Sequence, residues 1–304
     1  MSKHQSTLEL FRSFCFQNGA TDFEQAVEYF SVFGGMGWKV DFSKSLEELI
    51  EEKVLNNYRY IHADIAKITQ SDKIHHGVLT GIATGDGREH TAFKRANISR
   101  SEGEESIDFL VENNLLIRES SQAQPVNERE VVSDKYSFSL PFLRFWFSSI
   151  SPYYKGIREG DYSEMKKQFE NRKLHFSELA YTQLLRALII KNFREDGIEK
   201  MGAYWDKNTE IELLAKTRSS KIIAGSCKFS KAKAKKSELN RLKELCAKAE
   251  LEPDILLLFS KNGFSNELKK EKSATLKLYT LKNLKILMDD LSKKDLIIST
   301  NKRY

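Results

Sequence analysis

Two glutamates and a Ser-Cys-Lys tripeptide lie on stretches that the sequence predicts to be neighbouring strands. Glu210 and Glu212 are in the first apolar stretch, and Ser226, Cys227 and Lys228 end the second, with a polar turn between the two. Side chains two residues apart on a strand point to the same face. We therefore expect Ser226 and Lys228 to share one face with Cys227 opposite, and Glu210 to lie on the same side of its strand as Glu212.

Residues of these types could support metal-dependent hydrolysis of a phosphodiester. Mg²⁺ and Mn²⁺ prefer oxygen ligands. A bound ion polarises the phosphate and lowers the pKa of its water, while a nearby lysine stabilises the developing charge. Glu212 is the expected metal ligand and Lys228 the expected catalytic lysine. Ser226 stands where a second acid is needed, and Glu210 could replace that acid in part; Cys227 is a further candidate ligand.

A basic segment follows these residues. Lys231, Lys233, Lys235 and Lys236 lead into a predicted helix, whose N-terminal amides also favour phosphate. Residues 200–304 contain 24 Lys and Arg against 13 Asp and Glu, a net charge of +11, although the whole chain carries only +6. This asymmetry favours a polyanionic partner, DNA or RNA. A solvated basic turn in a lysine-rich protein is the alternative.

The elements predicted around these residues follow the order αβββαβ in a multidomain α/β protein. The run from Ile255 to Phe259 suits a strand buried on both faces. Strands 220–228 and 254–260, which a helix separates, are expected to pair in parallel. The elements are helix 174–194, strands 200–205, 209–216 and 220–228, helix 235–249, strands 254–260 and 275–280, and helix 281–291. This order is that of the restriction-endonuclease-like core of PD-(D/E)xK nucleases, although a generic hairpin with surface Glu and Lys stays open.

The N-terminal half is predicted to be helical. We expect a helical bundle over residues 1–57, a winged-helix-like module with an aromatic helix over 58–156, a polar linker over 157–173 and the last domain over 174–304. In the winged module, helix 104–114 is the one that can enter a major groove. Its exposed positions are acidic and would repel phosphate, so a protein-docking or packing role is favoured. The aromatic helix is expected to be buried and to end at Pro152.

Other classes of site find no support in the sequence. Neither FGGMGWK nor GDGREH has the spacing of a Walker A loop, so no nucleotide is expected. There is no run of about 18 apolar residues, so we expect no membrane span. Three widely spaced cysteines without a CxxC pair argue for a reducing cytoplasm. His75 and His76 lack zinc-binding spacing and are predicted to lie on a helix surface.

Three motifs resemble the C-terminal part of the archaeal-type ATPase family, in which a P-loop ATPase is followed by a winged helix and a nuclease-like domain of unknown function. The motifs are AVEYFSVFGG, DKYSFSLPFLRFWFSSISPYYKG, and YWDKNTEIELLAK with IIAGSCKFSK. They span nearly the whole chain in the order of the family. The Walker loops of the ATPase core are absent, so the resemblance implies no ATP hydrolysis.

The resemblance also implies roles for single residues. Glu212 stands where the family has Asp, and Lys228 matches the catalytic lysine. Ser226 replaces the family's Glu. A further Glu of the family, on the helix before the sheet, matches Thr182, although Glu178 lies one turn earlier on a similar face. The change from Asp to Glu212 keeps a carboxylate, but two of the four catalytic positions are lost, which implies weak or absent cleavage.

The leading hypothesis is a protein that binds DNA or RNA through a degenerate nuclease-like domain. One alternative is an interaction protein whose winged module docks a partner, such as a separately encoded ATPase. Another is an active Mg²⁺-dependent nuclease. The catalytic candidates are Glu212, Lys228, Ser226 and Glu178, and the candidate metal ligands are Glu212, Glu210 and Cys227.

Overall fold

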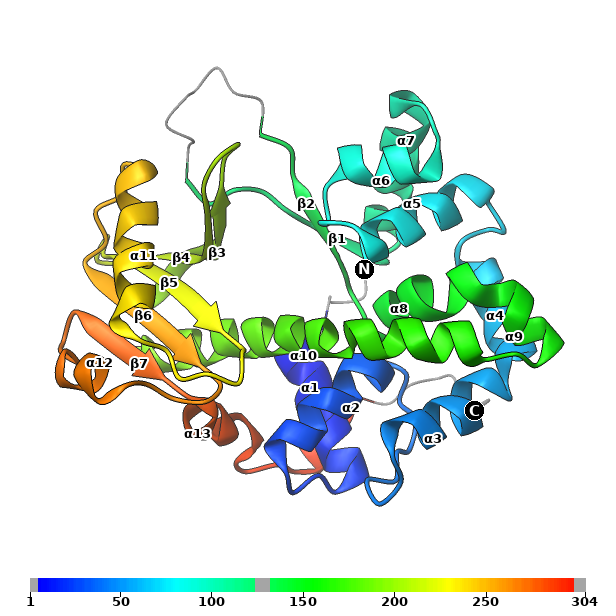
Figure 1. The fold of residues 1–304 in the computed structure, drawn as a ribbon, viewed down its shortest axis with the longest axis horizontal. Helices are drawn as coiled ribbons and strands as arrows, with labels where there is room; N and C mark the ends of the chain where they lie inside the picture. The colour runs from blue at the N-terminus through cyan, green and yellow to red at the C-terminus, as the bar shows by residue number, and fades with distance from the viewer. Residues whose placement is uncertain (1–4, 124–131, 298–304) are drawn as a thin grey trace. The chain divides into compact units, whose positions relative to one another are not determined.

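The structure, a computed structural model, describes residues 5–123 and 132–297 (Figure 1). The chain divides into two compact units: Met1–Arg118, Lys135–Tyr181 and Asp290–Tyr304 form the first, and Glu119–Asp134 and Thr182–Asp289 form the second. The first unit is mostly helical and the second contains a five-stranded sheet, which confirms the predicted mixed α/β composition with a helical N-terminal region. No helix in the described ranges is long and apolar enough to cross a membrane.

The first helices of the chain begin at polar caps. They are α1 (Thr7–Asn18), α2 (Phe23–Phe33) and α3 (Leu46–Ile50), followed by a π-helical turn (Glu51–Leu55). The Asp22 carboxylate caps α2 by accepting the backbone N–H of Gln25 at 2.8 Å. The apolar faces of α1 and α2 bring together the buried rings of Phe11, Phe23 and Phe30.

A run of helices and a two-stranded sheet follow. They are α4 (Tyr58–Ile68), α5 (Lys73–Thr84), α6 (Glu89–Ala96), α7 (Arg100–Glu112), β1 (Leu116–Glu119) and β2 (Lys135–Phe138). Gly81 lets α5 and α6 pack closely, because a Cβ there would meet the backbone of Ala92 at 2.7 Å. The helix predicted over 104–114 corresponds to α7, which begins four residues earlier than predicted.

The aromatic segment forms a continuous but irregular helical path. It consists of α8 (Pro141–Phe145), a π-helical turn (Trp146–Ile150), a 3-10 turn (Ser151–Tyr153) and α9 (Tyr154–Glu159). The phenylalanine and tryptophan rings are buried, as expected. The prediction that the helix ends at Pro152 was wrong. Pro152 lies in the first turn of the 3-10 segment, where a missing N–H is tolerated, so the helical path continues.

A long helix, α10 (Ser163–Asn192), occupies most of the segment predicted as a linker, so the linker over 157–173 was a wrong prediction. Met165, Phe169 and Phe176 recur at helical spacing and are buried. The polar composition of this segment therefore reflects only the exposed side of the helix. The division between the two units falls after Tyr181, inside α10, and not at residue 173.

The second unit contains one mixed sheet with the strand order β3-β4-β5-β6-β7. The strands are β3 (Ile198–Trp205), β4 (Glu210–Thr217), β5 (Ile222–Lys228), β6 (Ile255–Ser260) and β7 (Leu276–Tyr279). The pairs β3–β4 and β4–β5 are antiparallel, whereas β5–β6 and β6–β7 are parallel. The helices of this unit after β5 are α11 (Lys236–Lys248), α12 (Asn266–Lys270) and α13 (Leu281–Leu284), which a 3-10 turn (Lys285–Met288) follows. The parallel pairing of the strands on either side of α11 is confirmed, and α12 was not predicted.

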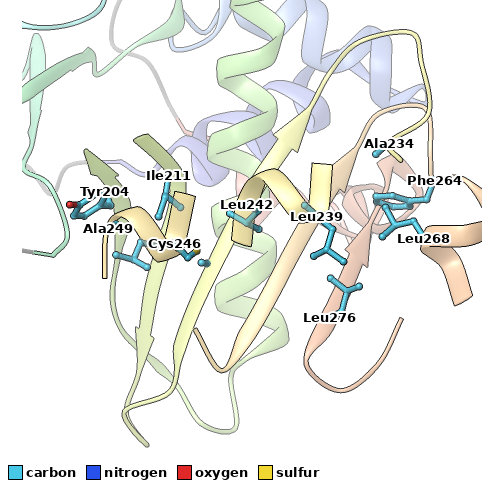
Figure 2. Close-up of a cluster of buried hydrophobic side chains, with 13 residues drawn as sticks. Tyr204, Ile211, Ala234, Leu239, Leu242, Cys246, Ala249, Phe264, Leu268 and Leu276 are labelled. Atoms are coloured by element: carbon cyan, nitrogen blue, oxygen red, sulfur yellow. The ribbon is translucent and has the colours of Figure 1, made fainter. Parts of the chain in front are cut away.

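Helix α11 covers one face of this sheet (Figure 2). Leu242 and Cys246 of α11 pack in one buried cluster with Leu258 of β6. Residues 182–192 of α10 lie on the opposite face, behind the strands in this view. Leu257, which points to that second face, is also fully buried. Both faces of β6 are therefore covered, as its apolar run predicted.

Candidate functional site

The sheet register places Glu212 beside the end of β5. Leu213 pairs with Gly225 across the antiparallel β4–β5 ladder, so Glu212 faces Ser226. The Ser226 hydroxyl donates to Glu212 Oε2 at 3.2 Å, and the backbone N–H of Cys227 donates to the same oxygen at 2.5 Å. The carboxylate is thus held by two donors from the neighbouring strand.

The surroundings of Glu212 act on its pKa in opposite directions. Burial is the largest influence and raises the pKa, and the nearby carboxylate of Glu210 raises it further. The hydrogen bonds from Cys227 and Ser226 lower it, as does Arg241. The net result is a pKa above the usual range of a glutamic acid. A carboxyl group with a raised pKa becomes protonated, and so neutral, at a higher pH than an exposed one.

Lys228 is held by a carboxylate that was not among the predicted site residues. Its ammonium group forms an ion pair with Glu238 in the first turn of α11, and each side chain is about one quarter exposed. Lys228 also pairs in register with Ser260 of β6, whose buried hydroxyl has no hydrogen-bond partner among the described residues. Lys228, Ser226 and Glu212 therefore lie on the side of the sheet that α11 covers.

Cys227 faces the other side of the sheet. Its thiol has a side-chain hydrogen bond with Thr182 of α10, and burial raises its pKa well above the ordinary value. Arg186, one turn further along α10, donates to the backbone oxygen of Glu212 at 3.5 Å and forms an ion pair with Glu119 at 2.9 Å. The structure thus brings Thr182 next to the Ser-Cys-Lys tripeptide, where its side chain interacts with the Cys227 thiol.

The two remaining acidic candidates are placed differently. Glu210 is the first residue of β4, is exposed and lies opposite Trp205 of β3. Glu178 belongs to the part of α10 in the first unit, where one of its carboxylate oxygens lies 3.6 Å from Nδ1 of His175.

The residues present do not fit a resident Mg²⁺ ion. Such an ion takes several oxygen ligands, with carboxylates supplying the charge. Within the ranges that the structure describes, no three His, Cys, Asp or Glu side chains gather at a place that could hold a metal. One oxygen of Glu212 already accepts from Cys227 and Ser226, and the carboxylate of Glu238 is paired with Lys228.

The basic segment after β5 is tied to the loop after β6. The backbone N–H of Ala234 donates to the oxygen of Gly263, and that of Ser265 donates to the oxygen of Ala234, both at 2.9 Å. Asn262 also donates to the oxygen of Ser230 at 2.9 Å. The exposed lysines of this segment are Lys231, Lys233 and Lys235. Lys236 is half-buried and forms an ion pair with Glu271 at 2.5 Å.

The sequence analysis missed three residues around the tripeptide. Glu238 had a weak signal, as an acidic residue in the first turn of the helix that follows the basic segment. Arg186 and Glu119 had none, because 67 positions separate them in the chain and only the tertiary fold of the second unit brings them together.

The chain matches one described family over part of its length. The family DUF234, described as "Archaea bacterial proteins of unknown function", matches residues 146–240. This range contains Glu212, Ser226 and Lys228 and ends within α11. Comparisons with curated proteins and with solved structures gave no match. The chain is therefore similar, over about a third of its residues, to a family whose description states no activity.

Proposed function

We propose that the protein binds nucleic acid through its second unit, and that this unit is a degenerate PD-(D/E)xK nuclease-like domain with weak or absent cleavage. The observation that carries the proposal is the pairing of Glu212 with Ser226 and the Cys227 N–H, next to Lys228. The Glu212 carboxylate and Lys228 stand on adjacent strands and on the same face of the sheet. Where a metal site would need a second carboxylate, Ser226 has a hydroxyl that donates to Glu212.

The topology of the second unit supports this interpretation. A helix precedes three antiparallel strands, and a crossover helix leads to a parallel fourth strand, which is the αβββαβ order of the restriction-endonuclease-like core. The exposed lysines at 231, 233 and 235 lie directly after the strand that carries Lys228. They supply the sequence-independent attraction to phosphate on which non-specific nucleic-acid binding depends.

The helices α5 to α7 and the strands β1 and β2 support a winged-helix interpretation of the first unit, but not DNA reading by α7. Two of the acidic side chains of α7 form ion pairs: Glu104 with Arg100 at 2.7 Å and Asp108 with Arg118 at 2.9 Å. An acidic helix repels phosphate. We therefore assign nucleic-acid binding to the second unit alone.

Binding can be tested with single- and double-stranded DNA and RNA of about 20 nucleotides at several salt concentrations. We expect wild-type binding to weaken steeply with salt. Replacing Lys231, Lys233 and Lys235 together by Glu should reduce affinity at least about tenfold in low salt and lower the salt slope by roughly 2 to 3. The matched control replaces the exposed Lys243, Lys248 and Lys282 by Glu.

Three outcomes would contradict the proposal or part of it. Equal losses in both triple variants would show that net charge, and not the basic segment, is responsible. No binding by the wild-type protein at low salt would exclude the nucleic-acid function and leave the interaction protein as the better hypothesis. A nicking assay with Mg²⁺ completes the test: efficient cleavage that disappears in Glu212→Ala and Lys228→Ala would mean an active nuclease.

A further inference from the structure

The ion pair between Lys228 and Glu238 lies where a strand end meets the start of a helix. Lys228 is the last residue of β5, and Glu238 is in the first turn of α11. Leu239, the next residue, packs in one buried cluster with Ala234 and Leu268, which fixes this turn against the core of the second unit (Figure 2). Each side chain of the pair is about one quarter exposed, so water reaches both charged groups.

The start of α11 favours an anion. The side chain of its N-cap residue, Lys235, accepts no hydrogen bond from the first backbone amides of the helix. These amides and the helix dipole both attract negative charge to this end. Glu238 supplies such a charge, and Lys228 pairs with it from the strand. A carboxylate of the chain therefore occupies a position whose electrostatic requirements a phosphate would also meet.

A second observation is the buried hydroxyl of Ser260 beside this pair. Ser260 and Lys228 are partners in the parallel β5–β6 ladder, so their side chains point to the same face of the sheet. Ser260 is fully buried, and its hydroxyl has no hydrogen-bond partner among the residues that the structure describes. A buried hydroxyl without a partner is unfavourable. The Lys228 ammonium has three donors, so once released by Glu238 it can serve both Ser260 and an external anion.

We propose, on the basis of the proposed nucleic-acid binding, that Glu238 occupies a phosphate position in the free protein and that a backbone phosphate of the bound nucleic acid displaces it from Lys228. The exposed lysines after β5 bring the backbone to this position, because Lys235 is both one of them and the N-cap of α11. The phosphate then accepts from Lys228 and from the first amides of the helix, while Glu238 turns to water. Glu238 is thus a residue that limits the affinity for nucleic acid.

The test is binding of single- and double-stranded DNA and RNA of about 20 nucleotides to the full chain at several salt concentrations. Glu238→Gln keeps the size of the side chain and removes the competing charge. We expect it to raise affinity about tenfold at low salt, since Lys228 becomes free to contact phosphate. Glu244→Gln makes the same change in net charge at an exposed position of the same helix, and it should raise affinity less than about twofold.

The gain must depend on Lys228. Adding Lys228→Met to Glu238→Gln should abolish the gain and lower the salt slope by roughly 0.7 to 0.9, because one phosphate contact is lost. Glu238→Ala should show the same gain as Glu238→Gln, with Glu244→Ala as its control, and replaces Glu238→Gln if that variant fails to fold.

The possible failures are distinguishable. A gain in Glu238→Gln no larger than that in Glu244→Gln overturns the displacement of Glu238 and leaves the proposed function intact. A gain that persists without Lys228 also overturns it, because loss of any negative charge near the exposed lysines would then explain the result. If neither the wild-type protein nor any variant binds DNA or RNA, the proposed function itself fails, and the displacement of Glu238 fails with it.

Discussion

At the scale of single residues, the Glu212 carboxylate is better suited to holding β4 and β5 together than to binding a metal. It accepts the backbone N–H of Cys227 and the hydroxyl of Ser226 at a place where both strands end. A Glu at position 226 would put a second carboxylate against Glu212, and the two would repel each other unless a cation lay between them. Ser226 removes that need, because its hydroxyl donates a hydrogen bond instead.

Removing this acceptor should destabilise the second unit. Glu212→Ala leaves the Cys227 N–H and the Ser226 hydroxyl without their partner, and we expect a loss of about 1 to 3 kcal/mol in the free energy of unfolding. Glu210→Ala, at the exposed start of the same strand, should change it by less than about 0.5 kcal/mol. Urea unfolding of both variants measures the difference. Equal effects would mean that Glu212 has no structural role.

At the scale of elements, α10 is the main difference between expectation and structure. Its first turns look like a linker in composition, since polar and charged residues dominate 163–173. Met165 and Phe169 nevertheless pack one turn apart, and Phe169 meets Phe145 edge to face with 5.5 Å between ring centroids. Two or three large apolar side chains are enough to dock a helix whose other positions face water.

A proline placed in this segment distinguishes a helix from a linker. Asn171 is exposed in the interior of α10. Asn171→Pro should cost about 3 kcal/mol or more, because it removes a helical hydrogen bond and clashes with the preceding turn. Asn171→Ala is the matched control and should be neutral or slightly stabilising. A linker would tolerate both, so similar apparent unfolding midpoints for the two variants would contradict the helix.

At the scale of the whole molecule, each unit carries its own charged chemistry. Exposed lysines follow β5 in the second unit, whereas the first unit contains two half-buried histidines on α5. His75 Nδ1 lies 2.8 Å from the hydroxyl of Ser106, and His76 Nε2 lies 2.7 Å from that of Thr69. The prediction that this pair lies on a helix surface was wrong, since α5 packs against α7 and the aromatic segment.

These histidines make the first unit sensitive to acid. Burial lowers the pKa of both His75 and His76 below the usual value of about 6.5. Below that pH the unfolded chain binds more protons than the folded one, so stability falls as the pH drops through it. We expect the free energy of unfolding to be constant from about pH 7 to 8 and to decline from about pH 6.5 to 5, with a slope of at most about 1.4 kcal/mol per pH unit for each proton.

Unfolding measured over this pH range checks the expectation. His76→Gln should show a shallower decline than wild type, whereas His90→Gln, at an exposed position, should follow the wild-type curve. Paired carboxylates, such as Asp295 with Arg12, have lowered pKa values and act only at more acidic pH. An unchanged slope in His76→Gln would show that other groups cause the decline.

Much of the fold could be predicted from the sequence because its signals are local. The side chains of Asp22 and Ser45 cap their helices by accepting backbone N–H groups three positions later in the chain. The apolar run in β6 indicates by its composition that this strand is buried. The parallel β5–β6 pair followed from the crossover helix between its two strands. The shared face of Ser226 and Lys228 followed from the period of a strand.

Only the tertiary structure decided which groups form hydrogen bonds and ion pairs with the residues of the candidate site. Glu212 finds its donors 14 and 15 positions away through strand register, Lys228 finds Glu238 through the docking of α11, and Arg186 finds Glu119 across 67 positions. Periodicity and caps depend on neighbours in the chain, so the sequence by itself determined the elements and their order. The charges pair across elements, where register and packing set the distances, and so the state of the candidate site depends on the assembled sheet.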